Sequence, residues 1–281
     1  MNIGFIGAGK VGFSLGKYFS VNNINVTGYY SRTFQAALEA SRFTDSKAYK
    51  NLEELVQNSD TIFITTPDDS ISDLWRDISC LQIKGKIICH TSGSISSKIF
   101  SNINNSGAFG YSIHPMFPFS DKFNTHKNLK NAYFSIEGSE EYLGYLCSFF
   151  QSLGNKVISI DRDKKSLYHL SNVIVSNLIL SLLNVGCSYL EDCGISSDNS
   201  MEALFPLIEN NIANLKNKGF IESLTGPIER ADLGTIKHHI SVMKSKDIEM
   251  YKSLSLNILQ LSKKKNPERD YEELEKYLEG I

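Results

Sequence analysis

The first half of the chain alternates short apolar runs with amphipathic segments. Val11, Leu15, Tyr18 and Phe19 repeat at helical spacing within residues 10–20, between the first two runs. Strands that alternate with helices are typical of parallel βαβ units, which build a doubly wound sheet. The apolar runs therefore predict seven strands, at residues 2–6, 24–30, 60–65, 86–90, 108–113, 132–137 and 156–160.

The pattern becomes helical after the charged residues 161–165. A long helix is predicted over about 164–191, and because its middle is apolar nearly all round, we expect it to be buried on most sides. Its most apolar stretch, 173–185, is interrupted by polar residues. The stretch falls short of the roughly 20 apolar residues that span a bilayer, so we expect no membrane segment.

Four further helices complete the pattern, and none of the later segments has a strand signal. The second helix covers about 198–217 with a kink at Pro206, and Thr235 is a candidate cap for the third. The fourth covers about 247–263, and Asn266-Pro267 is a candidate start for the last. We therefore predict an α/β fold with two domains. A Rossmann-type, doubly wound, mostly parallel sheet occupies 1–162, and an all-helical domain for substrate binding and dimerisation occupies 163–281.

Composition and charge narrow the class of protein. The chain has 281 residues with 41% hydrophobic and 21% charged residues, as in ordinary globular proteins. A net charge of −2 gives no field for binding nucleic acid or an anionic membrane. The five cysteines form no close CxxC pair, and the N-terminus enters a strand with no signal peptide. We therefore expect a cytoplasmic protein with reduced thiols.

A glycine-rich turn follows the first predicted strand and opens the first predicted helix. In G-x-G-x-x-G the first glycine permits a tight turn, the second lets the backbone approach a pyrophosphate, and the third allows close helix–strand packing. The helix N-terminus then presents free N–H groups to the phosphates. This context predicts a dinucleotide site at Gly7, Ala8, Gly9, Lys10, Val11 and Gly12.

The end of the second strand predicts which dinucleotide binds. An NAD enzyme places an acidic residue there for the ribose hydroxyl, whereas this chain has Ser31, Arg32 and Thr33. A guanidinium suits a phosphate through paired hydrogen bonds, so we expect NADP rather than NAD, the alternative being a solvated Arg32. Thr66, Pro67 and Asp68 follow the third strand at the same predicted edge and are expected to face the cofactor.

Polar residues at the next two strand ends are candidates for the substrate side. Ser92 follows the fourth strand and can hydrogen-bond a carbonyl or carboxylate. His114 precedes Pro115, which favours an extended backbone, and the phenylalanines that follow can shield a hydride-transfer site from water. A purely structural role for His114 is equally compatible with the sequence.

The long helix carries a second group of polar side chains. Lys165 and His169 lie four residues apart on one face, and Asn177 lies two turns further along. Reduction of a ketone requires a proton donor, and a histidine or a lysine can be tuned for that task. The alternative is that these side chains only tie helices together.

Arg230 lies in a polar connection between two predicted helices. Its guanidinium can clamp a substrate carboxylate or pair with Asp232. We expect no metal, because the adjacent His238 and His239 cannot face one ion from a helix and the chain has no HExxH or CxxC motif.

Taken together, these motifs resemble a family of bacterial Rossmann-like proteins with a C-terminal helical domain long described as of unknown function. Some members act as an alternative ketopantoate reductase in pantothenate synthesis. The family belongs to the 6-phosphogluconate dehydrogenase-like superfamily. The matching motifs occur in order along nearly the whole chain: His90-Thr91-Ser92-Gly93, Ile113-His114-Pro115, Lys165-Ser166-Leu167-Tyr168-His169 with Ser176-Asn177, and Leu224-Thr225-Gly226-Pro227 with Arg230 and Asp232.

The resemblance implies an NADPH-dependent reduction of 2-dehydropantoate to pantoate and a homodimer formed through the helical domain. The usual ketopantoate reductases of the same superfamily carry a catalytic lysine on the long helix. Alignment with them places His169 at that lysine and Asn177 at their second asparagine, while Val173 replaces the first. Ser92 matches their asparagine after the fourth strand. His169 or Lys165 would then supply the proton, and Ser92 and Asn177 would orient the substrate.

Two other functions are compatible with the sequence. The first is an NADP-dependent reductase of a different 2-oxo acid or of a cyclic imine. The second is a non-catalytic NADP-sensing protein, which needs the glycine-rich turn but no proton donor. The cluster of Lys165, His169 and Asn177 favours an enzyme.

Overall fold

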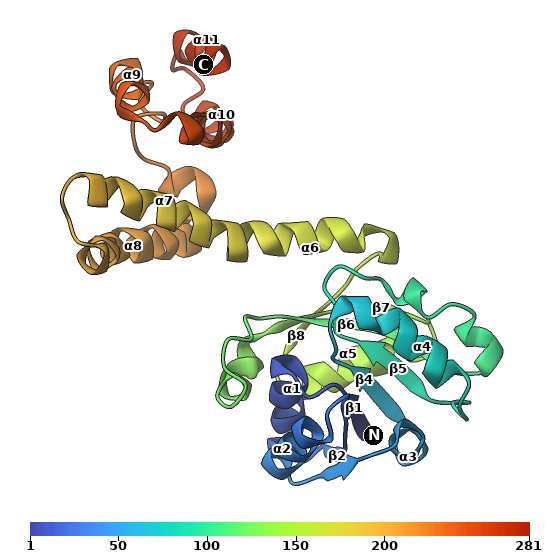
Figure 1. Cartoon of the computed structure of the whole chain (residues 1–281). Coiled ribbons are helices and arrows are strands. Elements are labelled where there is room, and N and C mark those ends of the chain that lie inside the picture. The colour runs from blue at the N-terminus through green and yellow to red at the C-terminus, as the bar shows by residue number, and fades with distance from the viewer. The chain divides into compact units, whose positions relative to one another are not determined.

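The computed structural model describes all 281 residues and divides into two units, Met1–Ile179 and Leu180–Ile281. A mostly parallel sheet forms the centre of the first unit (Figure 1). Only β6 and β7 pair antiparallel. The strands have the order β3-β2-β1-β4-β5-β6-β7-β8, with bounds β1 Asn2–Ile6, β2 Asn25–Tyr30, β3 Lys47–Tyr49, β4 Thr61–Ile64, β5 Ile87–His90, β6 Phe109–Met116, β7 Tyr133–Gly138 and β8 Lys156–Ser159.

This architecture confirms the predicted fold class and all seven predicted strands. The sequence pattern missed β3, an edge strand of three residues that is too short to show a periodicity. The order of strands reverses between β1 and β4, because β2 and β3 lie on one side of β1 and the later strands lie on the other. Such a switch point opens a crevice at the carboxyl ends of the strands, where α/β proteins bind ligands.

Helices cover both faces of the sheet, and each face has its own apolar core (Figure 1). Alternation along a strand assigns side chains to the two cores: Phe63 of β4 packs with the first cluster, and Ile62 and Ile64 pack with the second. The first cluster contains residues of α1 Lys10–Val21, α2 Phe34–Thr44 and α5 Leu143–Ser152, and the second contains residues of α3 Leu52–Gln57 and α4 Ile71–Ser79.

The predicted long helix forms in three consecutive parts. Residues Lys165–Val173 are α6, Ile174–Leu178 form a turn of π-helix, and Ile179–Asp192 are α7. The first unit ends at Ile179, so α6 makes its contacts in that unit, although we placed 163–281 in the helical domain from the sequence.

The expected burial of this helix on most sides is wrong within a single chain. Leu167, Val175 and Leu178 are each more than half exposed, and none of them belongs to an apolar cluster of either unit. By length and composition alone, Arg162–Asp192 is apolar enough to cross a membrane, with a mean hydropathy of 1.8 over its most apolar window. One such helix is weak support for a membrane segment, because core helices of soluble proteins have the same composition.

The second unit consists of helices only, as predicted. Its core, which includes Ile228 and Tyr271, joins the last three helices. Tyr189 fastens α7 to this unit, because its hydroxyl donates to Asp247 over 2.8 Å and accepts from the Lys244 amide. The remaining helices are α8 Ser197–Ser223, α9 Leu233–Val242, α10 Ile248–Lys265 and α11 Glu272–Gly280.

The continuous helix of α8 breaks at Gly219, whose φ of 77° is left-handed, near the predicted end at 217, and Pro206 lies inside the helix. Two local predictions in this unit are wrong. The cap of α9 is Asp232, whose carboxylate accepts from the Thr235 amide at 3.0 Å, and a carboxylate at a helix N-terminus also suits the helix dipole. Asn266 ends α10 instead of starting the last helix.

Candidate functional site

The glycine-rich turn brings β1, α1 and the end of β4 into close contact. Gly7 has a φ of 105°, which favours glycine, and a Cβ atom on Gly12 would lie 2.4 Å from the Thr65 hydroxyl oxygen. That hydroxyl donates to the Gly7 carbonyl over 2.9 Å and so holds the turn against β4. The turn geometry therefore matches the roles predicted for Gly7 and Gly12.

A cavity of about 520 Å³ opens beside this turn, at the carboxyl ends of β1, β2 and β4. The N-terminus of α1 faces it without a side-chain cap, and a Cβ atom on Gly9 would meet nothing within 4 Å. The buried Thr66 hydroxyl oxygen has no hydrogen-bond partner. Free helix N–H groups, an open backbone and an unpartnered hydroxyl suit the phosphates and ribose of a dinucleotide.

Most of the residues predicted to bind the cofactor line this cavity: Gly7, Ala8, Gly9, Ser31, Arg32, Thr33, Thr66 and Pro67. Lys10 and Val11 are the first residues of α1, and Gly12 packs behind the turn. Five lining residues were not predicted from the sequence: Ile6, Tyr30, Thr65, Ser70 and Leu74. The first three lie at the ends of predicted strands, and Ser70 and Leu74 lie near the start of the helix that follows β4. The cavity therefore has the parts that a dinucleotide site requires.

Asp68 connects the cavity with the neighbouring strand end. One carboxylate oxygen of Asp68 accepts from the hydroxyl groups of Ser92 and Ser94, each over 2.8 Å. The Ser92 hydroxyl oxygen also accepts from the Ile95 amide over 3.0 Å. Asp68 and Ser92 thus fix the loop after β5, and the Ser92 hydroxyl already has protein partners.

Lys165 is the most unusual residue at this edge of the sheet. Its side chain is only 2% exposed, although lysine is almost never fully buried, and the Nζ atom has no hydrogen-bond partner. Burial lowers the pKa of Lys165 to about 8, although the nearby charges of Glu137 and Asp68 raise it in part. The amine is protonated at pH 7 and close to its pKa, as a general acid requires.

Two histidines lie beside this lysine. The rings of His114 on β6 and His169 on α6 have centroids 6.3 Å apart, and His114 Nδ1 lies 2.8 Å from the Tyr168 hydroxyl. A Cβ atom on Gly93 would come within 2.5 Å of His169 Cδ2 and 2.9 Å of His114 Nε2. Glycine at this position therefore lets the loop after β5 contact both rings.

Burial sets the protonation of the histidines on the strands. It lowers the pKa of His114 to about 3, with further contributions from the charges of Lys165 and His169. His90, at the end of β5, is fully buried against Phe100, and neither of its ring nitrogens has a partner. Burial lowers its pKa to about 4, so both histidines are neutral at pH 7.

The structure brings together three of the five residues predicted for catalysis, Lys165, His169 and His114, beside the loop of Ser92. Asn177 lies on the exposed π-helical turn, where its side-chain oxygen accepts from the Ser176 hydroxyl over 2.9 Å. Arg230 belongs to the second unit and forms no ion pair with Asp232, whose carboxylate caps α9.

Tyr168, Glu137 and His90 were not predicted as site residues. Tyr168 stood in the helix pattern, but its partner His114 is 54 residues away in sequence. The buried Glu137 carboxylate accepts from the amide and hydroxyl of Ser97, over 2.7 and 2.6 Å. No local sequence signal identifies such pairs, because they depend on how strands are ordered.

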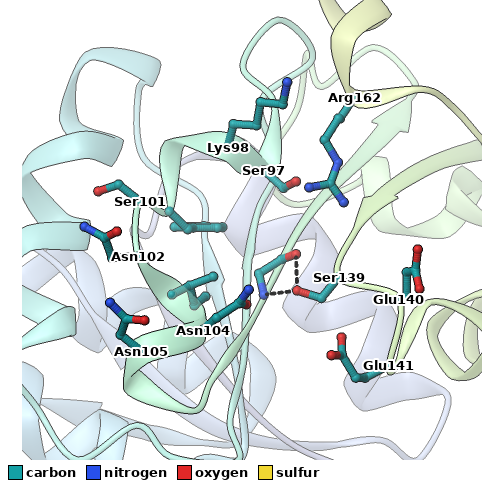
Figure 2. Close-up of a pocket in the computed structure, with 13 residues that line it drawn as sticks. Ser97, Lys98, Ser101, Asn102, Asn104, Asn105, Ser139, Glu140, Glu141 and Arg162 are labelled. Carbon is teal, nitrogen blue, oxygen red and sulfur yellow. Dashed lines mark hydrogen bonds between the residues drawn. The ribbon is translucent and has the colours of Figure 1, made fainter.

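A second cavity of about 530 Å³ lies elsewhere in the first unit (Figure 2). It is lined by polar side chains near the start of β6 and the end of β7, where the Gly110 amide donates to the Ser139 hydroxyl over 3.1 Å. Arg162 lines it and donates to the Gly138 carbonyl. The cavity contains none of the residues predicted from the sequence and no unpartnered buried polar atom.

Family comparisons agree with this arrangement of domains. Residues 1–115 match the model of a Rossmann-like domain, and residues 132–258 match a domain of unknown function named DUF2520. The chain is therefore similar to a Rossmann-like domain over its first part and to DUF2520 over its second. This order confirms the predicted resemblance to Rossmann-like proteins with a C-terminal helical domain.

Individual relatives share parts of the sequence or the whole fold. A stretch of 97 residues is 32% identical to the Bacillus subtilis protein named "Putative 6-phosphogluconate dehydrogenase YqeC". It covers 34% of this chain but only 32% of that relative, about a third of its length. Protein TM1727 from Thermotoga maritima is similar in structure, with a TM-score of 0.74 and 23% identity over 94% of this chain and 99% of that one.

Two other solved structures have the same fold. "Putative NADP oxidoreductase BF3122" from Bacteroides fragilis has a TM-score of 0.73 at 23% identity, over 92% of this chain and 98% of that one. Pyrroline carboxylate reductase from Plasmodium falciparum, solved with NADP bound, has a TM-score of 0.63 at 14% identity, over 95% of this chain and 97% of that one. At these identities the similarity shows the fold.

Proposed function

We propose that this chain is an NADPH-dependent oxidoreductase that reduces the keto group of a small 2-oxo acid. The observation that carries the proposal is the position of the buried Lys165 amine and the two neighbouring histidines, at the same sheet edge as the dinucleotide cavity. Asp68 follows the residues that line the cavity and bonds to the loop beside His114. The dinucleotide cavity, for the hydride donor, and the Lys165 amine, for the proton donor, would therefore lie at the same edge of the sheet.

The residues after β2 favour NADPH over NADH. Arg32 lines the cavity together with two hydroxyl residues, forms no ion pair within the chain, and has no acidic neighbour there to bind a ribose diol. A guanidinium binds a phosphate with paired, charge-assisted hydrogen bonds. The names of the two NADP proteins of similar fold support the same cofactor.

When bound, NADPH would supply one hydride to the carbonyl carbon and leave as NADP⁺. The chain's own residues then need to supply one proton to the carbonyl oxygen, which turns the C=O group into CH–OH. We assign this proton to Lys165, because its amine is charged at pH 7 and its pKa is near the working pH. His169 is the alternative donor, four residues along the same helix.

This proton donor favours a ketone over an imine as substrate. Hydride addition to a carbonyl produces an alkoxide, which has to be protonated, whereas hydride addition to a protonated imine gives a neutral amine directly. A buried cation also disfavours a cationic imine nearby. Structures of similar fold nonetheless include pyrroline carboxylate reductases and imine reductases, so cyclic imines belong in the substrate test.

The predicted family makes 2-dehydropantoate the first substrate to test. Ser92, Asn177 and Arg230 are our candidates for binding its polar groups. A homodimer through the helical domain and a cytoplasmic location also belong to this proposal, and the exposed apolar side chains of α6 and α7 support the dimer.

An NADPH-oxidation assay across 2-oxo acids and cyclic imines tests the proposal. We expect 2-dehydropantoate to give the highest kcat/KM, with NADPH well ahead of NADH. Turnover of cyclic imines alone would replace the ketone by an imine as the substrate class. Binding of NADPH without turnover of any compound would point to the sensing function instead.

A further inference from the structure

A hydrogen bond between Tyr168 and His114 joins α6 to β6 beside the buried lysine. The Tyr168 hydroxyl oxygen lies 2.8 Å from His114 Nδ1, and the two rings meet edge to face at 85° with centroids 5.7 Å apart. The Lys165 amine lies 5.2 Å from the centre of the Tyr168 ring. Tyr168 therefore contacts two members of the candidate catalytic cluster.

Both partners of this hydrogen bond are neutral at pH 7. Burial raises the pKa of Tyr168 above its ordinary value of 10.0, and burial, followed by the charges of Lys165 and His169, lowers the pKa of His114 to about 3. A neutral imidazole carries a single proton, on either Nδ1 or Nε2, and its other nitrogen is an acceptor. The hydrogen bond with Tyr168 selects between these two tautomers.

The chemistry of the two groups favours a bond that runs from the tyrosine to the histidine. A phenol O–H is a stronger acid than the N–H of a neutral imidazole, and the unprotonated ring nitrogen is a better acceptor than a phenol oxygen. Burial raises the pKa of Tyr168, whereas Ser135 and Asn172 lower it in part as side-chain donors to its oxygen, which leaves the phenol proton to His114 Nδ1. Nδ1 is then the acceptor, and the ring proton of His114 is on Nε2.

Nε2 faces the loop after β5, at the sheet edge where His169 also lies. A Cβ atom on Gly93 would lie 2.9 Å from Nε2, and no protein group accepts a hydrogen bond from this nitrogen. A neutral N–H held without a protein partner at this sheet edge is available to a carbonyl oxygen. Preorganised neutral donors of this kind stabilise the negative charge that develops on an oxygen during the reaction.

We propose that Tyr168 is a positioning residue that holds His114 as the Nε2–H tautomer, and that this N–H donates to the carbonyl oxygen of the substrate. The inference rests on the proposed reductase function and assigns different roles to His114 and Lys165. His114 binds and polarises the carbonyl, and Lys165 delivers the proton.

Variants of the two residues test the kinetic part. Tyr168→Phe keeps the ring and removes the hydroxyl, so we expect kcat to fall about tenfold, the effect of one lost hydrogen bond. His114→Asn should lower kcat by roughly a hundredfold, whereas His114→Gln, whose amide reaches the position of Nε2, should keep more activity. Tyr145→Phe, an exposed tyrosine on α5, is the matched control and should behave as the wild type.

Nitrogen-15 NMR of histidine-labelled protein tests the tautomer without any substrate. We expect His114 to show a protonated Nε2 and an unprotonated Nδ1, with loss of this preference in Tyr168→Phe and assignment through the signals missing in His114→Gln. A protonated Nδ1 in the wild type would overturn the inference. So would an unchanged kcat in Tyr168→Phe. Failure of the reductase proposal would appear separately, as no turnover of any ketone by the wild type.

Discussion

Replacing the buried lysine by an apolar residue should stabilise this protein while it stops the reaction. Lys165 is 2% exposed and its amine lacks a hydrogen-bond partner, so the folded state carries an incompletely compensated charge. Methionine has a similar shape and no charge, which makes Lys165→Met the matched substitution. The expected stabilisation can be worked out from the pKa of the amine.

The pKa of Lys165 falls from its ordinary value of 10.5 to about 8 on folding. At about 1.4 kcal/mol per pKa unit, the difference corresponds to about 3 kcal/mol of lost stability. Below pH 8 the amine is protonated in both the folded and the unfolded chain, so the cost is fully present. Between pH 8 and 10.5 the unfolded chain binds more protons, and the stability therefore rises with pH.

Urea denaturation of the wild type and Lys165→Met at pH 7 and pH 10 measures both effects. We expect the variant to be more stable by about 1–3 kcal/mol at pH 7 and the difference to shrink at pH 10, where most of the cost is gone. Lys164→Met, at the exposed neighbouring position, controls for loss of a surface charge. A variant that is less stable at pH 7, or a difference that does not change with pH, would refute the reasoning.

Three further predictions concern the cofactor, the proton donor and the assembly. Arg32→Ala should raise the KM for NADPH roughly ten- to a hundredfold and leave that for NADH nearly unchanged, because one charge-assisted contact is lost; an unchanged NADPH/NADH ratio would remove Arg32 from the site. Lys165→Met should lower kcat by about 10²–10⁴-fold with unchanged NADPH binding, whereas His169→Ala should keep most of the activity; the reverse result would make His169 the donor. Sedimentation should show a dimer at micromolar concentration and a monomer for Val175→Glu; a monomeric wild type would contradict the assembly.

Much of the fold could be predicted because its elements have strong local signals. The buried strands of a parallel sheet are short apolar runs, and the glycine-rich turn lies where strand and helix patterns meet. Strand β3 is too short for a periodicity, and the cap of α9 was assigned to the wrong member of an Asp232/Thr235 pair. The burial of the long helix could not be judged from its composition, because an apolar surface can be covered by its own chain or by a second copy.

The candidate site was predictable only in part, for a related reason. The sequence places Lys165 and His169 on one helix face, but the depth of each side chain depends on how α6 meets the strand ends. Lys165 is buried, whereas His169 is partly exposed. Tyr168 of α6 and His114 of β6 are 54 residues apart in sequence, and the fold of the intervening chain brings them into contact. Contacts over such separations carry no periodic pattern.

The buried lysine itself argues for a function at this edge of the sheet. Lys165 is buried at the start of α6, and its amine has no hydrogen-bond partner. We expect an apolar residue at that position to make the protein more stable, because the nearby Glu137 carboxylate already has its own partners at Ser97. A buried charge that lowers stability, with a strongly shifted pKa, is typical of functional sites. Here it lies beside two histidines and a cavity suited to a dinucleotide, which is where a reductase requires a proton.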